Sequence, residues 1–290
     1  MIVDLSNIYS GFSDKLRAIA FHIALNKLKK NSSNVFYVYE KKTKECPFRF
    51  IDYCRIEKIK IIKIKKKRKS LVNLTSYNTE ITLKNVIQNN PFKSINNNFL
   101  FKEWKNAYKK ILPGNKIIKK IKKIKLPKNF IGLHLRTTDR TLKFENIFNI
   151  QFKDTIFEFQ LEYFKKNISQ ILKKESKIKN VYIASDSKNI RDFIIKKLKK
   201  DNYKVFVNKS KYKKAFRETT GEDFLIDFFS LQLGKVVLST VGAGVAQSIF
   251  LMKNIEIINW NNQFNKFVFI RLVSLLLIFL KSLKKHIKIN

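Results

Sequence analysis

Cysteine, acidic side chains and long apolar runs are all scarce in this 290-residue chain. Its two cysteines, Cys46 and Cys54, provide neither a disulfide framework nor a cluster of metal ligands, and they favour buried free thiols in a reducing compartment. Residues 1–20 lack the basic start and apolar core of a signal peptide. These absences predict a cytoplasmic protein.

The apolar stretch at residues 267–280 is the best candidate for a membrane segment. It contains Arg271 and falls short of the roughly 20 residues needed to cross a bilayer. We expect residues 266–290 to form a helix with basic and apolar residues, and we expect this helix to fold back onto the core. Lysines flank this stretch, so an interfacial contact with a membrane is the alternative.

Basic residues far outnumber acidic ones, at 61 Lys and Arg against 22 Asp and Glu, which gives a formal net charge of +39. Such a charge fits an anionic partner, whether a nucleic acid, an acidic membrane face or a phosphorylated substrate. The densest tracts, residues 58–69 and 116–125, alternate Lys with Ile and predict amphipathic strand and helix surfaces. No helix-turn-helix, zinc finger or RNA-binding signature accompanies them, so no nucleic-acid partner is expected. Solvated faces, with a possible peripheral contact to an anionic membrane, explain the charge better.

The hydrophobic content, 44% of residues, supplies material for two cores. The length predicts roughly two domains of 100–150 residues each. We place the division near Pro127. This gives an N-terminal domain at 1–127, a C-terminal domain at 128–265 and the terminal helix at 266–290.

Apolar runs of strand length alternate with helical patterns in the second half. The runs cover residues 130–135, 181–184, 203–207, 236–238 and 255–258. The helical patterns cover residues 155–174, 187–200, 222–233 and 245–253. This alternation favours an α/β fold with a parallel, doubly wound sheet, and continuously apolar strands suit a sheet covered on both faces.

A glycine turn leads into the first helical pattern of the chain. Gly11 precedes the pattern, and Ser13 or Asp14 is placed to cap the helix. A turn of this kind offers free backbone amides to an anion. Lys15 and Arg17 oppose the helix dipole in the first turn, which a bound ligand would explain. An ordinary strand–turn–helix is the alternative.

The rest of the first half is less regular. Residues 2–5 and 35–39 read as strands. A helix is expected at residues 100–112, ended by Pro113 and Gly114.

Residues 131–140, Ile-Gly-Leu-His-Leu-Arg-Thr-Thr-Asp-Arg, carry the most information in the chain. Most of the basic charge is lysine, so the arginines of this segment stand out. Arginine presents a planar fork of donors that binds phosphate bidentately, which lysine cannot do. His134 and Arg136 alternate at the carboxyl end of a strand, where open α/β sheets bind ligands. A surface arginine pair beside a strand end is the alternative.

Two more polar segments follow predicted strands. Residues 239–244, Ser-Thr-Val-Gly-Ala-Gly, lie directly before a helix, and their small side chains would let a phosphate approach the backbone. The segment lacks the Gly-Lys-Ser/Thr ending of a P-loop. Asp186 follows the strand at 181–184, where it would hold a ligand hydroxyl or, as we favour, cap the next helix.

The order of these motifs resembles a known family, the α-1,6-fucosyltransferases, which include the rhizobial nodulation enzymes and share motifs with the wider GDP-fucose-dependent superfamily. The matching segments are Gly11-Phe12-Ser13-Asp14-Lys15-Leu16-Arg17, His134-Leu135-Arg136-Thr137-Thr138-Asp139, Ala184-Ser185-Asp186, Asp227 and Ser239-Thr240-Val241-Gly242-Ala243-Gly244. The His-x-Arg-x-Thr-Asp element is the most specific. The resemblance implies a GT-B fold of two Rossmann-like domains. In such a fold the C-terminal domain, residues 128–265, would bind the GDP-sugar donor, and the N-terminal domain, residues 1–127, would lie on the acceptor side.

The resemblance also implies roles for individual residues. Arg136 would hold the donor diphosphate, His134 would contact the nucleotide and Asp227 would accept hydrogen bonds from guanine. The full donor-binding set comprises His134, Arg136, Asp139, Asp186, Asp227, Thr240, Gly242, Ala243 and Gly244. The N-terminal glycine loop comprises Gly11, Phe12, Asp14 and Arg17. For Asp227, a solvated helix carboxylate is the alternative.

Several positions depart from the family pattern. Thr137 stands where family members carry a second arginine, and Gly242 and Ala243 replace the serines of the phosphate loop. The catalytic base aligns with Phe144, one residue short of Glu145, which makes Glu145 the candidate base.

The sequence therefore predicts an inverting glycosyltransferase that moves fucose from GDP-fucose to a glycan or lipid-linked glycan. No Asp-x-Asp motif is present, and neither a metal nor a cofactor is expected. A transferase that uses another nucleotide sugar is the first alternative. A non-catalytic basic protein that binds nucleic acid or membrane is the second.

Overall fold

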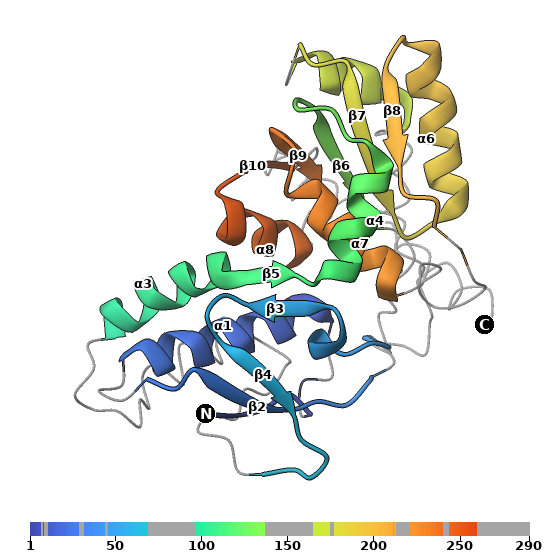
Figure 1. The fold of residues 1–290 in the computed structure, drawn as a ribbon. Helices are drawn as coiled ribbons and strands as arrows, with labels where there is room; N and C mark the ends of the chain where they lie inside the picture. The colour runs from blue at the N-terminus through green and yellow to red at the C-terminus, as the bar shows by residue number, and fades with distance from the viewer. Residues whose placement is uncertain are drawn as a thin grey trace, which may run out of the picture.

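The protein is an α/β protein with two parallel β-sheets (Figure 1). The computed structural model describes residues 1–6, 8, 11–28, 32–43, 46–68, 97–136, 165–174, 177–210, 212, 221–239 and 244–259. The predicted α/β class with parallel sheets is confirmed.

The larger sheet lies in the second half of the chain. Its five strands are β6 (Ile131–Leu135), β7 (Asn180–Ser185), β8 (Lys204–Val207), β9 (Val236–Ser239) and β10 (Glu256–Asn259). All neighbours are parallel, and the spatial order is β10-β9-β6-β7-β8. The chain runs outward from β6 to β8 and then continues on the other side of β6. The strand order thus reverses between β6 and β9, as in doubly wound folds.

Helices cover both faces of this sheet. One face packs against α6 (Lys188–Lys200) and the helical residues 165–174. The other packs against α7 (Gly221–Leu231) and α8 (Gly244–Lys253). Gly132 allows α7 to approach β6 closely, because a Cβ there would lie 2.8 Å from the Leu231 side chain. Coverage of both faces explains why the strands are mostly apolar, with polar residues concentrated at or near their ends.

The first half builds a smaller sheet. Its parallel strands, in the order β1-β2-β4, are β1 (Ile2–Asp4), β2 (Val35–Tyr39) and β4 (Lys60–Lys63). A separate antiparallel pair joins β3 (Cys54–Ile56) to β5 (Ile111–Pro113). The helical segments are α1 (Phe12–Leu28), η1 (Phe50–Asp52), α3 (Asn97–Ala107), η2 (Tyr108–Lys110) and α4 (Asn115–Ile124). The two lysine-rich tracts thus contain β4 and α4, as their patterns predicted.

Three local expectations were wrong. The helix expected to run to residue 112 ends at Ala107, because Ile111 and Leu112 pair with β3 in a sheet. Helix α1 begins at Phe12, so Ser13 and Asp14 lie inside its first turn and do not cap it. Ser187, not Asp186, is the N-cap residue of α6.

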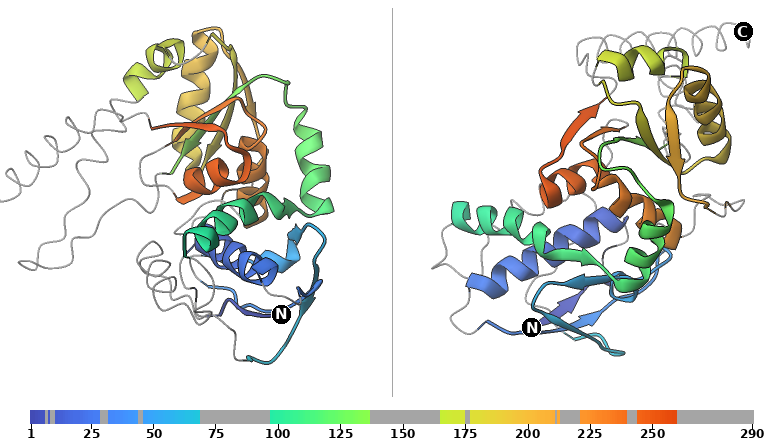
Figure 2. Two further views of the ribbon diagram at one scale, coloured as in Figure 1. Left: turned by 90° about the vertical axis from the view of Figure 1, so that its left-hand side faces the viewer. Right: turned by 45° about the horizontal axis from the view of Figure 1, so that its top comes forward.

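The two halves share a hydrophobic core. Helix α8 contacts α1 and α3, and α7 contacts α4. Both views in Figure 2 show α8 lying between the larger sheet and the helices of the first half. The change from one sheet to the other falls between α4 and β6, near Pro127. The division into domains at 1–127 and 128–265 stays a prediction.

No helix among the described residues combines the length and apolar character needed to cross a membrane. The expected helix at 266–290 lies outside those residues.

Candidate active site

The carboxyl ends of β6 and β9 mark the switch point of the larger sheet. Open α/β sheets bind ligands in the crevice at such a point. His134 lies near the end of β6, Arg136 directly follows that strand, and Gly244 begins the helix after β9. The two segments that the sequence indicated for phosphate binding therefore leave the two strands that flank the switch point.

The side chain of His134, on β6, is hydrogen-bonded to the neighbouring strand β9. Its imidazole Nδ1 shares a 2.9 Å hydrogen bond with Ser239 Oγ at the end of β9. Only 8% of His134 is exposed. The hydrogen bond fixes the ring orientation at the crevice.

Asp227 lies on the same face of the sheet. Tyr182 is the β7 partner of Gly132, and His134 follows Gly132 by two residues, so Tyr182 and His134 point to one face. The Tyr182 hydroxyl donates a 2.5 Å hydrogen bond to Asp227 Oδ1 on α7. Asp227 is 7% exposed, and the solvated-carboxylate alternative is therefore wrong.

Burial raises the pKa of Asp227 to about 8. The hydrogen bond from Tyr182 lowers this pKa, the charge of Asp223 raises it, and Arg191 lowers it. A buried carboxyl disfavours its charged form unless donors surround it. A ligand that donates hydrogen bonds to this carboxylate would favour its ionised form.

A tyrosine and an arginine that the sequence analysis missed complete this region. The Tyr212 hydroxyl donates to the Ser185 carbonyl at 3.1 Å, and the Arg191 guanidinium lies 4.5 Å from the Tyr212 ring centre. Burial raises the Tyr212 pKa, which Arg191 lowers and the charges of Asp227 and Asp186 raise. Tyr212 thus lies where the charges of both aspartates act on its hydroxyl.

One signal in the sequence pointed to Arg191. The chain has few arginines, and the same scarcity drew attention to Arg136. Nothing comparable distinguishes Tyr182 or Tyr212 from the other tyrosines, because their importance comes from contacts across the sheet.

The two glycine segments meet. A Cβ on Gly244 would lie 3.2 Å from the Ser13 Cβ. Arg17 bridges the helices, since its Nη2 donates to Gln247 on α8 at 2.5 Å and its Nη1 pairs with Asp14 at 3.0 Å. The N-termini of α1 and α8 therefore face each other across the two halves. Each N-terminus carries a partial positive charge suited to an anion.

Lys15 has a structural explanation, which corrects the expectation that a ligand offsets its charge. Its side chain is fully buried, and its Nζ lies 2.7 Å from Glu40 Oε1. It also donates to the Phe48 carbonyl at 3.4 Å. Glu40 in turn accepts a hydrogen bond from the Phe50 amide at 2.8 Å. This buried ion pair fixes the segment after β2 to α1.

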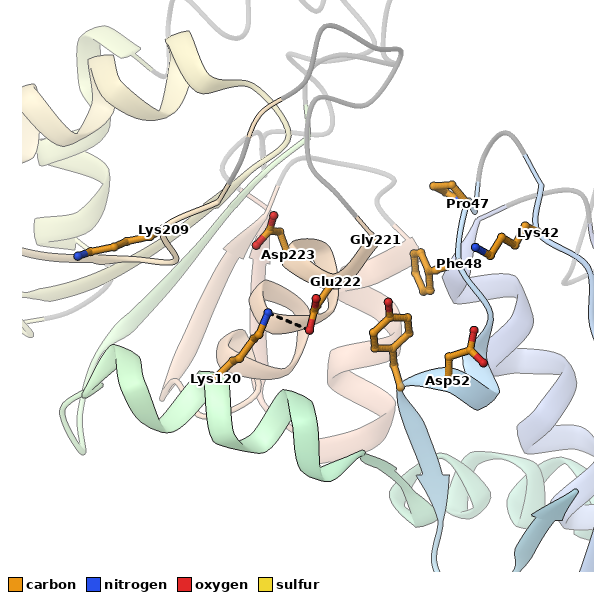
Figure 3. Close-up of a pocket in the computed structure, with 10 residues that line it drawn as sticks. Lys42, Pro47, Phe48, Asp52, Lys120, Lys209, Gly221, Glu222 and Asp223 are labelled. Carbon is orange, nitrogen blue, oxygen red and sulfur yellow. Dashed lines mark ion pairs between the residues drawn. The ribbon is translucent and has the colours of Figure 1, made fainter. Parts of the chain in front are cut away.

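A pocket of about 450 Å³ lies between the two halves (Figure 3). Its lining consists of Lys42, Pro47, Phe48, Asp52, Tyr53, Lys120, Lys209, Gly221, Glu222 and Asp223. The first half contributes the face with Phe48, while α7 contributes the opposite face with Glu222, which pairs with Lys120 at 2.9 Å. None of the sequence-predicted site residues lines this pocket, although Asp223 lies one turn before Asp227.

Several predicted site residues fall outside the described residues: Asp139, Glu145, Thr240, Gly242 and Ala243. The departures at Thr137 and Phe144 fall there too. Within the described ranges, no group of three or more His, Cys, Asp or Glu side chains could hold a metal ion. The expectation of a metal-independent reaction stays a prediction.

Comparison with known proteins gives structural likenesses alone. No protein-family model and no curated protein matches the chain. Crystal structures of POFUT1, a GDP-fucose protein O-fucosyltransferase, are similar in fold. The apo form aligns over 89% of this chain and 96% of that chain, with 12% identity and a TM-score of 0.47.

Two complexes of POFUT1 with GDP-fucose also align. One covers 88% of this chain and 94% of that chain, with 14% identity and a TM-score of 0.45. The other covers 54% of this chain and only 49% of that chain, with 16% identity and a TM-score of 0.35. The functional argument therefore rests on the residues of the site.

Proposed function

We propose that the protein is a fucosyltransferase-like glycosyltransferase, which transfers fucose or a related sugar from a GDP donor to a glycan. The observation that carries the proposal is the position of His134, Arg136 and Gly244 around the β6–β9 switch point. A nucleoside diphosphate suits this position, with an arginine fork and a helix N-terminus for its phosphates.

Arg136 and α8 supply the chemistry on the donor side. As the bond between sugar and phosphate breaks, negative charge grows on the departing GDP. Fixed donors aimed at that charge stabilise the transition state. A base, for which Glu145 is the candidate, deprotonates the acceptor hydroxyl as it attacks from the opposite face, so the configuration inverts.

Asp227 reads the guanine base in this proposal. Guanine presents an N1–H and an exocyclic amine side by side, and one carboxylate accepts both. Uracil and cytosine do not present that pair. His134, on the same face of the sheet, contacts the nucleotide.

The acceptor is a glycan or lipid-linked glycan that approaches from the first half. Exposed lysines on α4, among them Lys119, Lys122 and Lys123, offer a basic surface for peripheral contact with an anionic membrane. Activity on a lipid-linked acceptor that rises with the anionic lipid content of vesicles would support this contact.

Calorimetry with GDP, UDP and CMP tests the donor proposal. GDP should bind with a dissociation constant in the micromolar range, and UDP and CMP should bind more weakly. Preference for UDP would favour a transferase with another nucleotide sugar. No nucleotide binding, together with a steeply salt-dependent affinity for nucleic acid, would favour the non-catalytic alternative.

Activity should not require a divalent metal. The proposal assigns the donor charge to Arg136, backbone amides and the α8 N-terminus. Turnover of GDP-fucose in EDTA should equal turnover in Mg²⁺ or Mn²⁺. Loss of activity in EDTA, with recovery on adding Mn²⁺, would contradict this assignment.

Asp227→Asn should weaken GDP binding more than UDP binding. The amide NH₂ that replaces one oxygen is a donor facing the donors of guanine, which costs about 1–3 kcal/mol, or roughly 5- to 150-fold in affinity. Calorimetry with both nucleotides at pH 8.5, where Asp227 is mostly ionised, measures the change.

Asp223→Asn is the matched control. It removes the like charge that raises the pKa of Asp227, so GDP binding at pH 7 should stay unchanged or strengthen. Equal losses for GDP and UDP in Asp227→Asn would show that this residue does not read the base.

A further inference from the structure

We infer that Tyr182 is a positioning residue, which orients the Asp227 carboxylate and favours its ionised form, the form that recognises guanine. The inference rests on the proposed role of Asp227 in reading guanine.

The geometry of the pair carries the argument. Tyr182 comes from the middle of β7 and is fully buried, and its hydroxyl lies 2.5 Å from Asp227 Oδ1. Helix α7 packs on β7, and both side chains are buried in the contact between them. The hydrogen bond therefore fixes the rotation of the carboxylate.

The remaining acceptor positions suit guanine. An ionised carboxylate offers about four lone-pair sites, of which Tyr182 uses one on Oδ1. Within the described part of the chain, the second site on Oδ1 and those on Oδ2 remain for N1–H and the exocyclic amine. A protonated carboxyl places a donor where guanine also donates, so the charged form alone accepts both hydrogens.

Charged and titratable groups from several elements act on Asp227. Burial and the charge of Asp223 on α7 favour the protonated form. Tyr182 on β7 and Arg191 on α6 favour the ionised form. Tyr212 also senses the charge of Asp227. With its pKa near 8, Asp227 is mostly protonated at pH 7, and its affinity for guanine should grow as the pH rises.

The pH dependence of nucleotide preference tests the inference. UDP carries the same diphosphate as GDP, so the ratio of the two dissociation constants cancels titration of the phosphates. In the wild type, preference for GDP should rise about eightfold between pH 7 and pH 8.5, as the ionised fraction of Asp227 increases. In Tyr182→Phe this rise should move to higher pH, because the donor that favours ionisation is lost.

Tyr203→Phe is the matched control. Tyr203 is 4% exposed and belongs to the core on the opposite face of the same sheet. The pH dependence of its preference for GDP over UDP should coincide with that of the wild type. A Tyr182→Phe profile that also coincides with the wild type would overturn the inference.

A second measurement needs no nucleotide. The side-chain carboxyl ¹³C signal of Asp227, assigned by its loss in Asp227→Asn, should titrate near pH 8 in the wild type and at higher pH in Tyr182→Phe. An unchanged midpoint would overturn the coupling. If GDP does not bind the wild type, the donor proposal and the guanine readout fail together, and the carboxyl signal still decides whether Tyr182 controls Asp227.

Discussion

Arg136→Lys should lower kcat/KM by about 30- to 1000-fold, which corresponds to roughly 2–4 kcal/mol of lost transition-state stabilisation. Arg136 leaves the end of β6 at the switch point, where the diphosphate is expected. Lysine keeps the positive charge but loses the planar fork that binds two phosphate oxygens at once. Steady-state kinetics with GDP-fucose measures the loss.

The fold should tolerate this substitution, so the thermal midpoint should stay near that of the wild type. Arg55→Lys is the matched control, because Arg55 is exposed and donates a 3.4 Å hydrogen bond to the Pro113 carbonyl. Its kcat/KM should not change. A kcat/KM near that of the wild type in Arg136→Lys would contradict the proposal that Arg136 binds the donor diphosphate.

Glu40→Gln should lower the free energy of unfolding by about 3–5 kcal/mol. Glu40 and Lys15 are both fully buried side chains 2.7 Å apart. Removing the negative charge leaves the ammonium of Lys15 buried with carbonyl partners alone. Urea denaturation followed by circular dichroism measures the change.

Two comparisons separate the buried pair from ordinary surface charge. Asp52→Asn breaks the partly exposed pair with Arg49, and it should cost less than about 1 kcal/mol. Replacing both buried partners, Lys15→Met with Glu40→Leu, should destabilise less than Glu40→Gln alone, since no charge stays buried. Similar small losses in Glu40→Gln and Asp52→Asn would contradict this account of the pair.

The strands of the second half were predictable because each one is a short apolar run between helical patterns. β6, β7, β8, β9 and β10 begin and end within two residues of the predicted runs. Their composition reflects burial on both faces, which acts on every residue of the strand. The phosphate-site candidates Arg136 and Gly244 could be found for a related reason, since each follows a strand or begins a helix.

Local pattern did not predict the end of α3. Residues 108–112 fit the helical pattern of residues 100–107, yet Ile111 and Leu112 pair with β3, which lies more than 50 residues earlier in the chain. Pairing with β3 outweighs the weak helix propensity of these residues. The residues around 111 contain no pattern that identifies β3 as their partner strand.

The sequence by itself determined the α/β class, the strands of the larger sheet and the residues suited to phosphate at their ends. Tertiary structure alone decided the strand order that puts the switch point between β6 and β9. It also decided that Lys15 pairs with Glu40 and that Asp227 lies buried against Tyr182. The physical reason is the distance along the chain over which each effect acts. The periodicity of apolar residues within one element indicates which of its faces is buried. The charge state of a buried group depends instead on donors and charges from segments that are distant in the sequence.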